Sequence, residues 1–174
     1  MSSSASRARR LTFAAALVAA VLAPSAEAAG PLAWPNVDPR LGEPFQASVT
    51  LAATRLEDAS CAAVYGDFAD SRSGRPLSER LAETGQSAAG YLRWITFWSG
   101  VGLRPCDDRK VLAYTSPGSR VVFVCRDQFL RQQSRDATFA ANILVHESLH
   151  SLGLAENPPS PNEVTKGVEA RCGR

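Results

Sequence analysis

Apolar residues first recur at helical spacing after a proline-rich start. Over residues 45–63 they gather on one face of an expected helix that ends near Cys61. A polar, glycine-containing loop over residues 70–76 follows, and the pattern after it predicts a short helix over residues 77–81. The first half of the predicted domain is therefore mainly helical.

Aromatic and β-branched residues then concentrate in three runs, which predict β-strands. The first run covers residues 91–98. The second and third cover residues 111–115 and 120–125, and they flank a Pro-Gly turn at residues 116–119. This arrangement is typical of a hairpin. We expect a short antiparallel sheet.

Helical spacing returns in the last third of the chain. A short polar helix is expected near residues 129–133. Asp136 can cap a longer helix that reaches Leu152, and Gly153 is its natural stop signal. Because apolar residues surround most of this helix, it is expected to be buried. A final helix over residues 162–172 completes a single α+β domain.

The start of the chain has the pattern of a secretory signal. Arginines precede an apolar run over residues 11–23, and an Ala-x-Ala ending follows at Ala28. The run is shorter than the roughly 20 residues that span a membrane. We therefore expect a signal peptide over residues 1–28, a proline-rich leader over residues 29–44 and a domain over residues 45–174. The expected location is secreted or periplasmic.

The net charge argues against a nucleic-acid-binding protein, and the cysteine content indicates a disulfide-bonded one. Removing residues 1–28 takes three arginines and one glutamate from 19 basic and 17 acidic residues, which leaves the chain formally neutral. We expect no nucleic-acid partner and no membrane contact after signal cleavage. Four cysteines in an exported chain predict two disulfides with three possible pairings. We favour Cys106 with Cys125, across the hairpin, and Cys61 with Cys172.

The chain contains two histidines, and both lie in the segment His146-Glu147-Ser148-Leu149-His150. On a helix, residues four apart share one face, so both imidazoles can bind one metal ion. The glutamate after the first histidine lies to the side, where it can reach a water on the metal. This spacing predicts zinc at His146 and His150, with Glu147 as the general base of a hydrolase.

A catalytic zinc site needs a third protein ligand. No further histidine exists, so a side-chain ligand must be a carboxylate. Glu156 is the first choice, because Gly153 can adopt the positive φ that turns the chain back towards the helix. Glu169 is the second choice, and Glu163 is the third.

The motif resembles that of the zincin metallopeptidases. With Gly153 and Glu156 it is similar to the extended metzincin pattern, although Glu156 replaces the usual third histidine and no methionine follows. Residues 156–160 also resemble a group of small exported bacterial proteins of metallopeptidase type. The resemblance implies a zincin-like fold, zinc bound by the motif histidines with Glu147 as base, and an antiparallel strand that holds substrate above the cleft.

The expected activity is hydrolysis of a peptide or protein substrate. The strand over residues 121–124 is a candidate for the edge that pairs with an extended substrate. Tyr114 and Arg120 are two candidates for stabilising the developing oxyanion. The sequence leaves the oligomeric state open.

Two alternatives belong to other classes of protein. One is an exported zinc-binding module without catalysis, against which the intact Glu147 argues. The other is a disulfide-stabilised interaction domain without metal. For that domain, Trp94, Phe97 and Trp98 would form an exposed aromatic patch; the simpler reading is strand residues that alternate between core and surface.

Overall fold

The first helix, α1, begins earlier than its apolar pattern predicts. The computed structural model describes residues 36–173, so the expected signal peptide and the first residues of the leader lie outside the described part. Leu41 is fully buried, and α1 spans Gly42–Leu56. The end of the predicted leader therefore already belongs to the packed fold.

The predicted helix over residues 45–63 is interrupted. After α1 come α2, Ala59–Ala62, and α3, Val64–Asp67. The interruption lies at Asp58, whose backbone is extended and whose side chain accepts a 2.7 Å hydrogen bond from the backbone N–H of Ser60. Such an N-cap starts a new helix and so ends the continuity of the old one.

The predicted strand over residues 91–98 is wrong in its first half. After α4, Leu77–Glu83, the chain forms α5, Ala88–Trp94, and only then β1, Thr96–Ser99. The hydroxyl of Ser87 accepts from the backbone N–H of Gly90 at 3.0 Å, which caps α5. Here the cap and the burial of one helical face override the strand propensity of the aromatic residues.

The sheet is mixed rather than antiparallel. Its other strands are β2, Ala113–Thr115, and β3, Val121–Val124, in the order β1-β3-β2. The β2–β3 hairpin is antiparallel, as predicted, but β1 and β3 are parallel. A short 3-10 helix, Arg104–Asp107, lies between β1 and β2. The hairpin makes β3 antiparallel to β2, and β3 lies between β2 and β1, with which it runs parallel.

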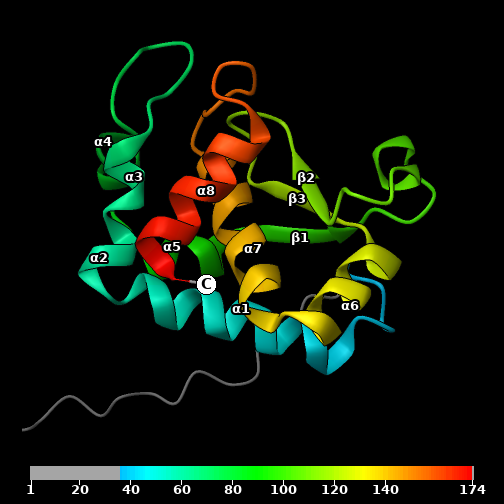
Figure 1. Cartoon of the computed structure of the whole chain (residues 1–174). Coiled ribbons are helices and arrows are strands. Elements are labelled where there is room, and N and C mark those ends of the chain that lie inside the picture. The colour runs from blue at the N-terminus through cyan, green and yellow to red at the C-terminus, as the bar shows by residue number, and fades with distance from the viewer. Residues whose placement is uncertain (1–35, 174) are drawn as a thin grey trace, which may run out of the picture. The chain divides into compact units, whose positions relative to one another are not determined.

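Three helices follow the sheet: α6, Arg126–Arg135; α7, Ala137–Ser151; and α8, Pro161–Cys172. The predicted cap of α7 is confirmed, since Asp136 accepts from the backbone N–H of Phe139 at 2.9 Å. Helix α7 contacts α1, α6, α8 and the β2 strand (Figure 1). It is buried along most of its length, as its apolar surroundings predict.

Aromatic side chains join the helical layer to the sheet. The ring of Phe45 in α1 meets Phe97 in β1 and Phe129 in α6, with centroids 5.2 and 5.5 Å apart and edge-on geometry. All three rings are buried. Phe97 therefore points into the core while Trp98 points outward, which confirms the expected alternation for these two residues, whereas Trp94 lies in α5.

Both favoured disulfides are confirmed, Cys61–Cys172 and Cys106–Cys125. They fit an oxidising environment such as that of exported proteins. Among residues 36–173, no helix combines the length and the apolar character needed to cross a membrane.

Candidate metal centre

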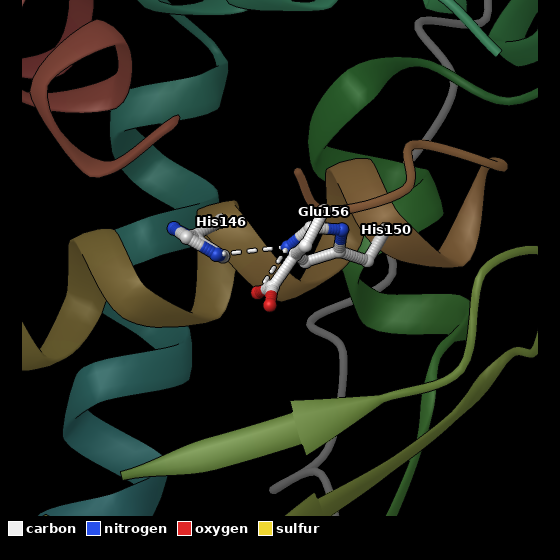
Figure 2. A group of neighbouring side chains, drawn as sticks. All are labelled: His146, His150 and Glu156. Atoms are coloured by element: carbon white, nitrogen blue, oxygen red, sulfur yellow. Dashed lines mark hydrogen bonds and ion pairs between the residues drawn. The ribbon is translucent and has the colours of Figure 1, made fainter. Parts of the chain in front are cut away.

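The two histidines project from one turn of α7 towards a shared point. Their Nε2 atoms lie 2.9 Å apart, and the ring centroids are 4.8 Å apart. A carboxylate oxygen of Glu156 lies 3.4 Å from Nε2 of His150. Figure 2 shows the carboxylate beside the facing ring edges. One ligand atom from each residue lies within 4.8 Å of the others, so this group could hold a metal ion.

The turn after α7 returns Glu156 to the helix. Gly153 has a φ of +117°, and its N–H donates to the carbonyl of His150 at 2.9 Å. A Cβ at this position would collide with a carboxylate oxygen of Asp70, so glycine is required by both conformation and space. The positive φ predicted for Gly153 is confirmed.

The outer nitrogens of both imidazoles are hydrogen-bonded. Nδ1 of His150 lies 2.8 Å from the carbonyl oxygen of Leu154. Nδ1 of His146 lies 3.1 Å from the hydroxyl of Thr165 on α8. Burial lowers the pKa of His146 to about 3, with a smaller contribution from His150. His146 is therefore neutral at physiological pH, which is the form that binds metals.

Glu147 lies beside the histidines with its carboxyl group buried. Burial raises its pKa to about 8, and the nearby carboxylate of Glu156 adds to the rise. A hydrogen bond from the backbone N–H of Thr115 acts in the opposite direction. Its Oε2 atom has no hydrogen-bond partner among residues 36–173. A buried carboxyl with a free oxygen beside the histidines is placed to exchange a proton with a water molecule at this position.

These residues lie along a cleft of about 990 Å³. It is lined by α7 residues between Phe139 and His150, by β2, and by α8 residues between Pro161 and Glu169. Both lysines of the chain, Lys110 and Lys166, also line it. The candidate metal group therefore faces a space large enough for a segment of peptide.

The structure separates the three carboxylates considered as a third ligand. Glu156 joins the histidine group. Glu163 instead completes a capping box, in which its carboxylate accepts from the backbone N–H and hydroxyl of Ser160 at 2.8 and 2.6 Å. Glu169 lines the cleft but is not part of the histidine group.

The two candidates for oxyanion stabilisation also differ in position. Tyr114 lines the cleft. The guanidinium of Arg120 lies 3.8 Å from the ring centroid of Trp94, and Arg120 is not among the residues that line the cleft. Of the two, Tyr114 is the one placed near the histidines.

The strand over residues 121–124 is not an edge, so its predicted pairing with substrate is wrong. This strand, β3, lies between β1 and β2 and is paired on both sides. The strand that borders the cleft is β2. Alternating apolar residues could not distinguish a central strand from an edge strand, because both bury one face of the sheet.

Sequence reasoning missed three groups that hold the site: the hydroxyl of Thr165, the carbonyl of Leu154 and the backbone N–H of Thr115. The carbonyl has a local signal, since it lies four residues beyond His150 where the helix ends. The other two come from distant segments and have no spacing that marks them.

The residues fit a metal ion. Two neutral imidazole nitrogens and one carboxylate oxygen are donors that zinc accepts in catalytic sites. Both Nδ1 atoms are held by neighbouring groups, so both Nε2 atoms face the shared point. Comparison of the chain with protein-family models, curated proteins and solved structures found no match.

Proposed function

We propose that this chain is a zincin-like, zinc-dependent metallopeptidase of an exported compartment. The observation that carries the proposal is the group of His146, His150 and Glu156 beside the buried carboxyl of Glu147. These residues supply three ligands and a separate base, which is the composition of a hydrolytic zinc site. A purely structural site has no use for the base.

The residues have distinct roles in this proposal. His146, His150 and Glu156 hold the ion, and bound zinc lowers the pKa of water and polarises a carbonyl group. Glu147 accepts the proton of the attacking water on its free oxygen and passes it to the leaving amine. Burial raises the pKa of that carboxyl, which favours holding the proton before it is passed to the amine.

The edge of β2 supports a peptide substrate. It is paired with β3 on one side only, and it borders the cleft on the other. The N–H of Thr115 points to Glu147, away from β3. Because hydrogen-bonding directions alternate along a strand, the peptide groups of Ala113 face the same side. They can bind an extended substrate by strand addition.

The test is metal analysis and peptide cleavage on the wild type, Glu147→Gln and the exposed surface control Glu43→Gln. We expect about one zinc per chain in all three. Cleavage should fall by a factor of about 10²–10⁴ only in Glu147→Gln, because a general base contributes that much. Metal analysis that finds no zinc in the wild-type protein would contradict the proposal.

A second candidate, a zinc-binding interaction module without catalysis, has one observation in its favour. The large apolar side chains with most exposure among residues 36–173 all fall between residues 94 and 103. They are Trp94, Trp98, Val101 and Leu103, with exposed fractions of 39–51%. This candidate expects zinc in the wild type with no cleavage of any peptide, so the same experiment separates the two.

A further inference from the structure

The hydroxyl of Thr165 reaches the metal centre from a different helix. It lies 3.1 Å from Nδ1 of His146, whose side chain is buried. A ring nitrogen opposite a metal-binding nitrogen is normally held by a carboxylate, a carbonyl or water. Each of the first two only accepts a hydrogen bond, whereas a hydroxyl can donate or accept.

The proton on His150 is fixed by its partner. The carbonyl of Leu154 can only accept, so Nδ1 of His150 carries the hydrogen and its Nε2 presents a lone pair. In protein stripped of metal, Nε2 of His146 can therefore donate across the 2.9 Å that separate the two Nε2 atoms. Nδ1 of His146 then presents a lone pair to Thr165.

A metal ion held at this point would reverse the arrangement at His146. Both Nε2 atoms must then direct lone pairs at the ion, so the His146 proton moves to Nδ1. The ring remains neutral and loses no proton overall. Thr165 can follow by rotation about its C–O bond, changing from donor to acceptor. A carbonyl or carboxylate in the same place would hold the proton on Nδ1 in both states, so in metal-free protein two lone pairs would face each other across the 2.9 Å between the Nε2 atoms.

The position of Thr165 is fixed by contacts at both ends of α8. The Ser160 capping box holds the start of the helix. At the other end, Cys172 is bonded to Cys61, and Arg171 donates to both carboxylate oxygens of Asp67 at 2.7 Å. The hydroxyl is therefore presented to His146 by a helix that is tied to the rest of the fold.

We propose that Thr165 is the positioning residue of the metal centre. Its hydroxyl donates to Nδ1 of His146 in metal-free protein and accepts from the same nitrogen when zinc is bound. It thereby keeps the ring aimed at the ion in both states. The proposal rests on the metal site of the proposed function but does not require that peptides are cleaved.

Two variants test it. Thr165→Val has the same shape without the hydroxyl, and Thr165→Ser restores the hydroxyl. Zinc affinity is measured by competition with a chromophoric chelator. We expect Thr165→Val to bind zinc about 10–100-fold more weakly than the wild type, as for other groups that orient a ligand. Thr165→Ser should stay close to the wild type. Equal affinity in Thr165→Val and wild type would overturn the proposal.

A second readout follows the ring itself. In long-range ¹H–¹⁵N spectra, His146 of wild type and Thr165→Ser should carry its proton on Nε2 without metal and on Nδ1 with zinc. The unprotonated Nδ1 of the metal-free proteins should be shielded relative to Thr165→Val, because it accepts a hydrogen bond. A proton on Nδ1 of His146 both with and without zinc would contradict the proposed change of hydrogen-bond direction at Thr165. Zinc binding without cleavage overturns only the proposed function.

Discussion

Glu156 is the member of the metal group whose position depends most on its surroundings. The histidines share one helix and are buried, whereas the side chain of Glu156 is 47% exposed and follows the helix by a loop. The loop carries it to within 3.4 Å of His150. Sequence spacing favours Glu156 over Glu169 and Glu163 as the third ligand. In the structure, only Glu156 of these three belongs to the histidine group.

Replacing Glu156 tests its role as a ligand. Glu156→Gln should weaken zinc binding by at least about tenfold, because an amide is a poorer and uncharged donor. Glu169→Gln is the matched control, since Glu169 lines the same cleft outside the group. Zinc competition measures both. Loss of affinity in the control alone would assign the third ligand to Glu169 instead.

At the scale of elements, the turn after α7 depends on a contact with a distant loop. Gly153 lies against Asp70, and its carbonyl accepts from the N–H and the hydroxyl of Ser71 at 3.0 and 2.9 Å. The loop over residues 70–76 therefore supports the turn that positions Glu156.

Gly153→Ala should destabilise the fold by more than its backbone strain alone. A positive φ costs an alanine about 1 kcal/mol, and the clash with Asp70 adds to that cost. Gly85→Ala is the control, because Gly85 has a φ of +69° and the methyl group of an alanine there would meet open space. Urea unfolding measures both free energies. A similar loss in the two variants would mean that the contact with Asp70 is unimportant.

Asp70 also makes the same loop sensitive to acid. Hydrogen bonds from the backbone and side chain of Ser73 hold the pKa of Asp70 below its usual value, with help from Arg72 and Arg80. A carboxyl whose pKa is depressed in the folded state stabilises the fold above its unfolded pKa of about 3.9. That stabilisation is lost as pH falls through the lower folded pKa.

The expected result is a pH-dependent gap between wild type and Asp70→Asn. At pH 7 the wild type should have the larger free energy of unfolding, by about 1–3 kcal/mol for a charged group with several hydrogen bonds. Below about pH 4 the gap should narrow. Denaturant titrations across this range measure it, and a gap that is constant with pH would contradict the role of the Asp70 charge.

The sequence predicted correctly those elements that are determined by residues close together in the chain. The α7 cap at Asp136, the stop at Gly153 and the β2–β3 hairpin follow from residues a few positions apart, and all three are confirmed. The residues at 91–94 favoured a strand, but a serine cap and burial made them helical. The parallel pairing of β1 with β3 depends on contacts between distant segments, which no local pattern contains.

The same division applies to the candidate site. His146, Glu147 and His150 were found because their spacing on one helix is itself the signal. Thr165 and Thr115 reach the site from other elements, so their roles depend on how α8 and β2 pack against α7.

At the scale of the whole molecule, two disulfides of different span hold the fold. Cys61–Cys172 joins residues 111 positions apart, whereas Cys106–Cys125 joins residues 19 apart. The longer one ties α8, and with it Thr165, to α2. The shorter one ties the segment before β2 to the start of α6.

Removing each disulfide should have a different effect. In the chain-entropy model, the Cys61→Ala/Cys172→Ala variant loses about 4–5 kcal/mol and Cys106→Ala/Cys125→Ala loses about 3 kcal/mol. Only the first should also weaken zinc binding, because it releases the helix that carries Thr165. Unfolding and zinc competition measure the two effects. Weaker zinc binding in the second variant alone would contradict this assignment.

The long disulfide has a further consequence for a protein proposed to cut peptides. A chain cleaved once at any bond between Cys61 and Cys172 stays one covalent molecule until it is reduced. Self-digestion at one such bond would therefore leave the band on a non-reducing gel near its original position. The fragments would separate only after thiol treatment, so a preparation that looks intact can already be nicked.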